Sequence, residues 1–94
     1  MHTAEQALLD GVADRAVPVE RLDDEALELA GVIAQNGPLA VRLAKSAIDR
    51  GLDLPLDAAL ELEWQRYQEV LGTRDRDEGV IAFSEKRPPK YEGR

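Results

Sequence analysis

The sequence predicts an all-α fold of four to five short helices. Apolar residues recur at helical spacing along most of the chain, and no segment shows the alternation that is typical of a strand. Glycine and proline divide the chain into pieces of helix length. We therefore expect one helical domain over residues 1–94, with a linker-like start at 1–18 that carries one short helix and a helical assembly region at 19–94.

The first two helices are expected over residues 3–10 and from Asp23 or Asp24 to about Ala34. Thr3 can cap the first helix and Gly11 can stop it. Between the two helices, residues 17–19 (Val-Pro-Val) predict an extended connector, because the residue before a proline avoids the helical region. One apolar face of the second helix is formed by Leu27, Ala30, Ile33 and Ala34.

The third and fourth helices are expected over about 38–50 and 55–71. Gly37 can adopt a positive φ at the preceding turn, and Pro38 and Pro55 suit helix starts. The apolar stripe of the third helix is Val41, Ala44, Ala47 and Ile48, and that of the fourth is Leu56, Leu60, Trp64, Tyr67 and Leu71. For Trp64 and Tyr67 the favoured interpretation is core packing.

A fifth helix is expected over about 74–86, capped by Thr73. Its start is acidic and its end carries Lys86 and Arg87, which is the arrangement that a helix dipole favours. Pro88 and Pro89 prevent the helix from continuing. Two interpretations of the terminal cations remain open: they stabilise the helix end, or they hold an anion.

The charge of the chain is uneven. Its formal net charge is −7, which argues against nucleic acid as a partner of the whole chain. Residues 1–73 hold 14 acidic and 6 basic side chains, whereas residues 74–94 hold 5 acidic and 6 basic ones. The last segment is therefore the one region where an anion meets no net repulsion.

Several function classes lack their usual residues. The chain has no cysteine, and its one histidine, His2, is near the terminus, so we expect no metal site. Nucleophile–base pairs and glycine-rich phosphate loops are absent, and Glu61 and Glu63 point to different helix faces, so we expect no catalytic residues. No apolar stretch is long enough for a membrane span, and a cytoplasmic protein is expected.

Two segments resemble one known family. Residues 36–63 (NGPLAVRLAKSAIDRGLDLPLDAALELE) and 73–94 (TRDRDEGVIAFSEKRPPKYEGR) resemble the C-terminal third of the enoyl-CoA hydratase/isomerase (crotonase) superfamily. Residues 73–89 fit the pattern T-x-D-x-x-E-G-x-x-A-F-x-E-K-R-x-P throughout, and residues 3–18 resemble the segment that follows the family's catalytic core. The second half is also similar to methylglutaconyl-CoA hydratases.

The resemblance implies an acyl-CoA thioester as ligand, no other cofactor, and a lyase reaction of fatty acid metabolism that hydrates a 2,3 double bond. The family's two catalytic glutamates and its oxyanion donors belong to a β-spiral domain that matches nothing in these residues. Residue by residue, Phe83 corresponds to the aromatic near the CoA adenine, Lys86 to the lysine near the CoA phosphates, and Tyr67 to an aromatic beside the acyl pocket. On a helix, Phe83 and Lys86 would share a face.

Three functions compete. The first is an assembly module that forms a homo-oligomer, a trimer or a helix-exchanged dimer, and that borders an acyl-CoA site without catalysis of its own. The second is an independent helical protein–protein interaction domain that binds no CoA. The third, a minimal working hydratase, is disfavoured because the acid/base pair and the oxyanion donors are both missing.

Overall fold

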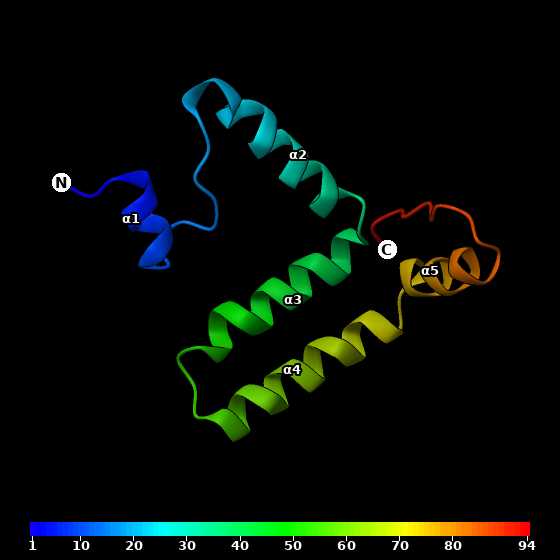
Figure 1. Cartoon of the computed structure of the whole chain (residues 1–94). Helices are drawn as coiled ribbons and strands as arrows, with labels where there is room; N and C mark the ends of the chain where they lie inside the picture. Colours follow the sequence, from blue (N-terminus) through cyan, green and yellow to red (C-terminus); the bar gives the residue numbers. More distant parts are fainter. The chain divides into compact units, whose positions relative to one another are not determined.

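The computed structural model describes all residues, 1–94, and its regular elements are all helices (Figure 1). The predicted all-α fold is confirmed. The elements are α1 (Ala4–Leu9), a 3₁₀-helix η1 (Val19–Arg21), α2 (Leu22–Ala34), α3 (Pro38–Gly51), α4 (Leu56–Leu71) and α5 (Arg74–Ser84). The chain divides into two compact units, residues 1–32 and 33–94, which are described separately.

In the first unit the predicted helix stop and cap are present. The side chain of Thr3 accepts a hydrogen bond from the Gln6 backbone N–H at 3.1 Å, and Gly11 has a φ of +73°. The extended connector is one residue shorter than expected. Pro18 is extended, but Val19 already opens the 3₁₀ turn of η1, which leads directly into α2.

In the second unit, α3 and α4 form an antiparallel hairpin (Figure 1). The helices approach closely near the turn, where a Cβ on Gly51 would lie 3.5 Å from Ala59 Cβ. Our expectation of a positive φ at Gly37 is wrong: its φ is −58°, so the chain enters α3 without the left-handed turn. Gly37 is buried instead against the ring of Tyr91.

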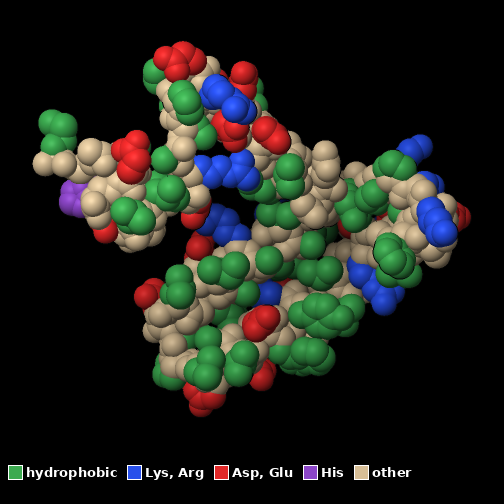
Figure 2. Space-filling model, viewed as in Figure 1, with side chains coloured by type: hydrophobic (Ala, Val, Ile, Leu, Met, Phe, Trp, Pro, Cys, Tyr) green, Lys and Arg blue, Asp and Glu red, His purple; other side chains and the backbone are tan.

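Very little of the chain is buried. The fully buried residues with side chains are Ala82, 1% exposed, and Asp75, 5% exposed. The prediction that Trp64 and Tyr67 pack in a core is wrong for this chain, because their exposed fractions are 53% and 52%. The predicted apolar stripe of α4 lies largely in the open, and Figure 2 shows hydrophobic side chains gathered along α3 and α4. The predicted spacing places these side chains on one face, but no other segment of the chain covers that face.

The accessible surface is correspondingly large, at 7804 Å². Two separately compact units of 32 and 62 residues would together expose about 6400 Å². The chain therefore exposes about 1400 Å² more total surface than two compact units would, and the apolar side chains along α4 are among those left exposed.

Candidate functional site

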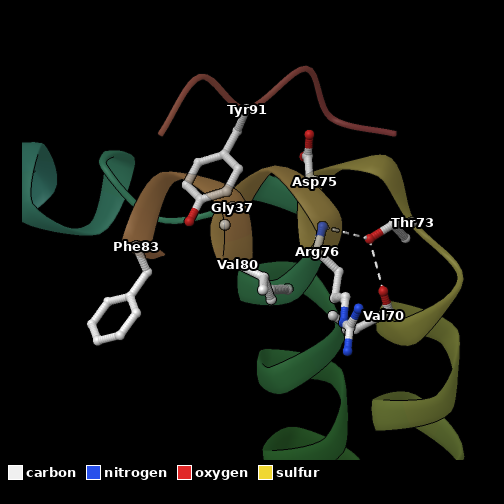
Figure 3. A pocket seen from close by; sticks show the side chains of 10 residues that line it. Gly37, Val70, Thr73, Asp75, Arg76, Val80, Phe83 and Tyr91 are labelled. Atoms are coloured by element: carbon white, nitrogen blue, oxygen red, sulfur yellow. Dashed lines mark hydrogen bonds between the residues drawn. The ribbon is translucent and has the colours of Figure 1, made fainter. Parts of the chain in front are cut away.

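Helix α5 begins with a side-chain cap. Thr73 Oγ1 accepts a hydrogen bond from the Arg76 backbone N–H at 3.2 Å and donates one to the Val70 carbonyl at 2.7 Å (Figure 3). The threonine therefore closes the end of α4 and the start of α5 at once, as its predicted role as a cap requires. This fixes the direction in which α5 leaves the hairpin.

The buried carboxylate of Asp75 holds the end of the chain. Asp75 Oδ1 accepts a hydrogen bond from the Glu92 backbone N–H at 2.7 Å, and Oδ2 accepts one from the Gly93 N–H at 2.9 Å. The Asp75 N–H in turn donates to the Arg94 carbonyl at 2.9 Å. Residues 87–94, which we call the C-terminal strap, are thus tied to the first turn of α5.

A second carboxylate, Glu78, holds the strap one helical turn further on. Both of its oxygens bind the Arg87 guanidinium, with N–O distances of 2.6 and 3.1 Å, and Oε1 also accepts the Lys90 backbone N–H at 2.7 Å. These hydrogen bonds, with the Arg87 side chain first and the Lys90 N–H second, lower the pKa of Glu78 from 4.5 to about 2. The same pair raises the pKa of Arg87.

We expect acid to loosen the strap only below about pH 4.5. Because the pKa of Glu78 is about 2 in the folded chain and 4.5 otherwise, its contribution is complete above pH 4.5 and is lost as the pH falls towards 2. NMR of the Lys90 amide, which reports on its hydrogen bond to Glu78, checks this. The Glu78→Gln variant should lack the transition, and a wild-type midpoint at 4.5 or above would contradict the assignment.

The end of α5 differs from the sequence prediction. The helix stops at Ser84, and Lys86 lies beyond it with a φ of +53°. The Lys86 N–H donates to the Phe83 carbonyl at 3.2 Å and the Arg87 N–H to the Ala82 carbonyl at 3.0 Å, which together form a Schellman motif. Lys86 and Phe83 therefore do not share a helical face, because the chain has already turned away at Lys86.

Tyr91 packs the strap against two glycines. A Cβ on Gly79 would lie 3.3 Å from the Tyr91 hydroxyl, and a Cβ on Gly37 would lie 3.7 Å from the ring. Figure 3 shows Tyr91 reaching from the strap towards Gly37, at the start of α3. The ring bounds a cavity of about 380 Å³ whose walls also include Arg76, Val80 and Phe83. The tyrosine thus links α3, α5 and the strap.

The three residues expected to bind CoA are not gathered in one cavity. Phe83 is 86% exposed and borders the cavity beside Tyr91 (Figure 3). Lys86 is exposed and its ammonium has no ion-pair partner. Tyr67 lies on α4 beside Trp64, with ring centroids 5.7 Å apart, and borders a separate apolar groove of about 720 Å³ between α3 and α4.

Three contributors to this site were not predicted: Asp75, Glu78 and Tyr91. Asp75 and Glu78 were interpreted only as acidic residues that suit a helix start, and Tyr91 was not interpreted at all. One feature of the sequence could have predicted the role of Glu78: Pro88 and Pro89 end the helix, so Arg87 can pair with Glu78 if the chain folds back there. No group of three or more His, Asp or Glu side chains is placed to hold a metal ion.

The α3–α4 hairpin, helix α5 and the C-terminal strap together form a segment that is found in one class of protein. The family model described as enoyl-CoA hydratase/isomerase matches residues 1–94, so the chain belongs to the enoyl-CoA hydratase/isomerase family. This confirms the resemblance stated from the sequence. None of the helices combines the length and hydrophobicity that crossing a membrane requires.

Individual relatives agree with this assignment. The chain is 45% identical over 69 residues to the human mitochondrial methylglutaconyl-CoA hydratase, which matches 73% of this chain and 20% of that protein. It is 39% identical over 90 residues to the short-chain-enoyl-CoA hydratase of Clostridium acetobutylicum, which matches 96% of this chain and 34% of the relative. The curated relatives are therefore about three times as long as this chain or longer.

A solved structure matches the fold closely. The enoyl-CoA hydratase from Bacillus anthracis superposes with a TM-score of 0.94 at 47% sequence identity, over 97% of this chain and 35% of that one. At this similarity both the helical arrangement and the family are shared.

Proposed function

We propose that this chain serves as the oligomer-assembly segment and as one edge of the acyl-CoA site in an enoyl-CoA hydratase/isomerase. The observation that supports it best is the use of the residues in the 73–89 pattern. Six of them make internal contacts: Thr73, Asp75, Glu78, Ala82, Glu85 and Arg87. The side chain of Phe83, near the end of α5, and that of Lys86, in the turn after it, are both exposed and available to a ligand.

The chemistry of these two side chains suits the adenine end of coenzyme A. An exposed aromatic ring offers a face on which a nucleobase can stack, and a lysine ammonium is a compact charge for a phosphate. Arg87, the neighbouring cation, is occupied by Glu78 and Glu85. The phosphate contact is therefore assigned to Lys86.

Tyr67 has a different part in the proposal. Its half-exposed ring lies on the apolar groove between α3 and α4, and an apolar surface of this kind suits an acyl chain rather than a phosphate. We assign it to the border of the acyl pocket. Since that groove is open, the remaining walls of the pocket would come from other parts of the protein or from another subunit.

Assembly is the second half of the proposal. The exposed apolar faces of α2 and α4 favour a homo-oligomer, a trimer or a dimer with exchanged helices. A cytoplasmic location is part of the proposal, although the matched human relative is named as mitochondrial. The same surface also favours the competing function, an interaction domain without CoA. Binding of CoA separates the two.

Calorimetry with coenzyme A tests the site. We expect weak binding that Lys86→Ala reduces by about 1.4- to 5-fold, because one exposed charge contact contributes about 0.2–1 kcal/mol. Lys90→Ala is the matched control, since Lys90 is an exposed strap lysine whose ammonium has no ion-pair partner. Equal affinities for the two variants would refute the assignment of Lys86, and tight binding by all three proteins would place CoA elsewhere.

The isolated chain should not hydrate an enoyl-CoA. No residue here corresponds to the acid/base pair or the oxyanion donors that the reaction requires. A spectrophotometric assay of the enoyl thioester checks this. Turnover that follows the protein through a second purification would overturn the expectation.

A further inference from the structure

The backbone of Lys86 lies in a conformation that lysine rarely adopts. Its φ of +53° falls in the left-handed region, where glycine is the usual residue at this position of a Schellman motif. A side chain there is disfavoured by contact between its Cβ and the backbone. Such a conformation persists only where the surrounding structure holds it.

The contacts that hold it come from both neighbours of Lys86. The carboxylate of Glu85 accepts a hydrogen bond from Arg87 Nε at 2.6 Å, so the residues before and after Lys86 are joined directly. The Arg87 guanidinium also binds both oxygens of Glu78, at 2.6 and 3.1 Å. Arg87 is thus anchored to the middle of α5, and the turn at Lys86 is closed on both sides.

These contacts also leave Arg87 without a free donor edge. Its Nε faces Glu85, its two terminal nitrogens face Glu78, and Nη1 also donates to the Pro88 carbonyl at 3.2 Å. Arginine is ordinarily the better bidentate ligand for phosphate. In this chain its fork is used on a carboxylate, and the neighbouring lysine is the cation that remains exposed.

We propose that Glu78 and Arg87 are positioning residues that hold the Lys86 turn in place so that its ammonium meets the phosphates of coenzyme A. This inference rests on the proposed function and adds how that site is built. Neither residue touches the ligand, and both act through the backbone turn at Lys86. Weakening the ion pair should therefore remove the contribution of Lys86 even though the lysine is still present.

A double-mutant cycle tests the proposal, with coenzyme A as the probe in calorimetry. Arg87→Lys keeps a positive charge but cannot form the two-pronged contact with Glu78, and we expect it to weaken binding by about as much as Lys86→Ala, about 1.4- to 5-fold. In the Arg87→Lys background, Lys86→Ala should then cause no further loss. Arg94→Lys is the matched control, because it makes the same change at an exposed strap arginine and should leave the affinity unchanged.

A second measurement is independent of the ligand. Hydrogen exchange at the Arg87 amide, which donates to the Ala82 carbonyl, should speed up in Glu78→Gln and in Arg87→Lys but not in Arg94→Lys. Exchanging the charges, Glu78→Arg with Arg87→Glu, should restore part of both the protection and the affinity. If Glu78 or Arg87 acted through its own charge and not through the ion pair, exchanging the two charges would restore neither the protection nor the affinity.

The outcomes distinguish a failure of the CoA site from a failure of the positioning role. If Lys86→Ala leaves CoA binding unchanged, the proposed function fails. If Lys86→Ala weakens binding but Arg87→Lys and Glu78→Gln do not, only the positioning role is overturned. Fully additive losses in the cycle, or unchanged protection of the Arg87 amide, would also overturn it.

Discussion

Light scattering coupled to size exclusion should show that the chain is a homo-oligomer at ~100 μM. The outcome is tied to this concentration because oligomerisation depends on it. The physical reason is the apolar surface along α4, where Leu60 is 55% and Trp64 53% exposed. Burying such surface stabilises by about 25 cal/mol per Å². The excess of about 1400 Å² over compact units exceeds the roughly 800 Å² per partner of a standard interface.

Variants on α4 identify the surface. Leu60→Glu should shift the chain towards monomer, since a carboxylate would have to be buried at the contact. Gln68→Glu introduces the same charge on the same helix at an exposed polar position and should leave the mass unchanged. A wild-type monomer with a cooperative thermal transition would favour the independent interaction domain instead, because the chain would then stabilise its own fold.

Asp75→Ala should lower the free energy of unfolding by about 1.5–3 kcal/mol, the range for hydrogen bonds to a charged group. The substitution removes the acceptor of both the Glu92 and the Gly93 N–H, so the strap should leave the first turn of α5. Because Asp75 is 5% exposed, solvent compensates these bonds poorly in the folded chain. Urea denaturation at one fixed protein concentration measures the loss.

Asp77→Ala is the control for this experiment. Asp77 is another carboxylate near the start of α5, but its side chain is 65% exposed and pairs only with Arg76. Its loss should cost about 0.3–1 kcal/mol through the helix dipole. Equal destabilisation by the two substitutions would show that Asp75 acts through its charge near the helix start and not through the strap.

The sequence was sufficient to place the helices, because their ends are determined by local chemistry. Thr3 and Thr73 cap as predicted, and Pro38 opens α3. The burial of the apolar stripes could not be predicted in the same way. Spacing shows which side chains share a face but not whether this chain supplies the covering surface, so Trp64 and Tyr67 were expected in a core and lie half in solvent.

The site was predicted in part, for a related reason. Phe83 and Lys86 were singled out by resemblance, and their exposure is consistent with a role in binding. Their shared helical face was not found, because α5 ends at Ser84, two residues before Lys86. Beyond Ser84 the chain turns at Lys86, and Glu78 and Asp75 bind residues 9–18 positions further along. Helical periodicity does not predict contacts of this kind.

The strap also affects how the segment can acquire its structure. Its hydrogen bonds to Asp75 and Glu78 join residues separated by 9, 12, 17, 18 and 19 positions, so the loops that these bonds close are short. The entropy lost on closing a loop grows with its length, so these short loops cost less to close than long ones. These hydrogen bonds between α5 and the strap are local and form quickly, whereas the contact of Tyr91 with Gly37 joins the strap to the start of α3 and closes a much longer loop. The hydrogen bonds between α5 and the strap can therefore form before the strap packs against the start of α3.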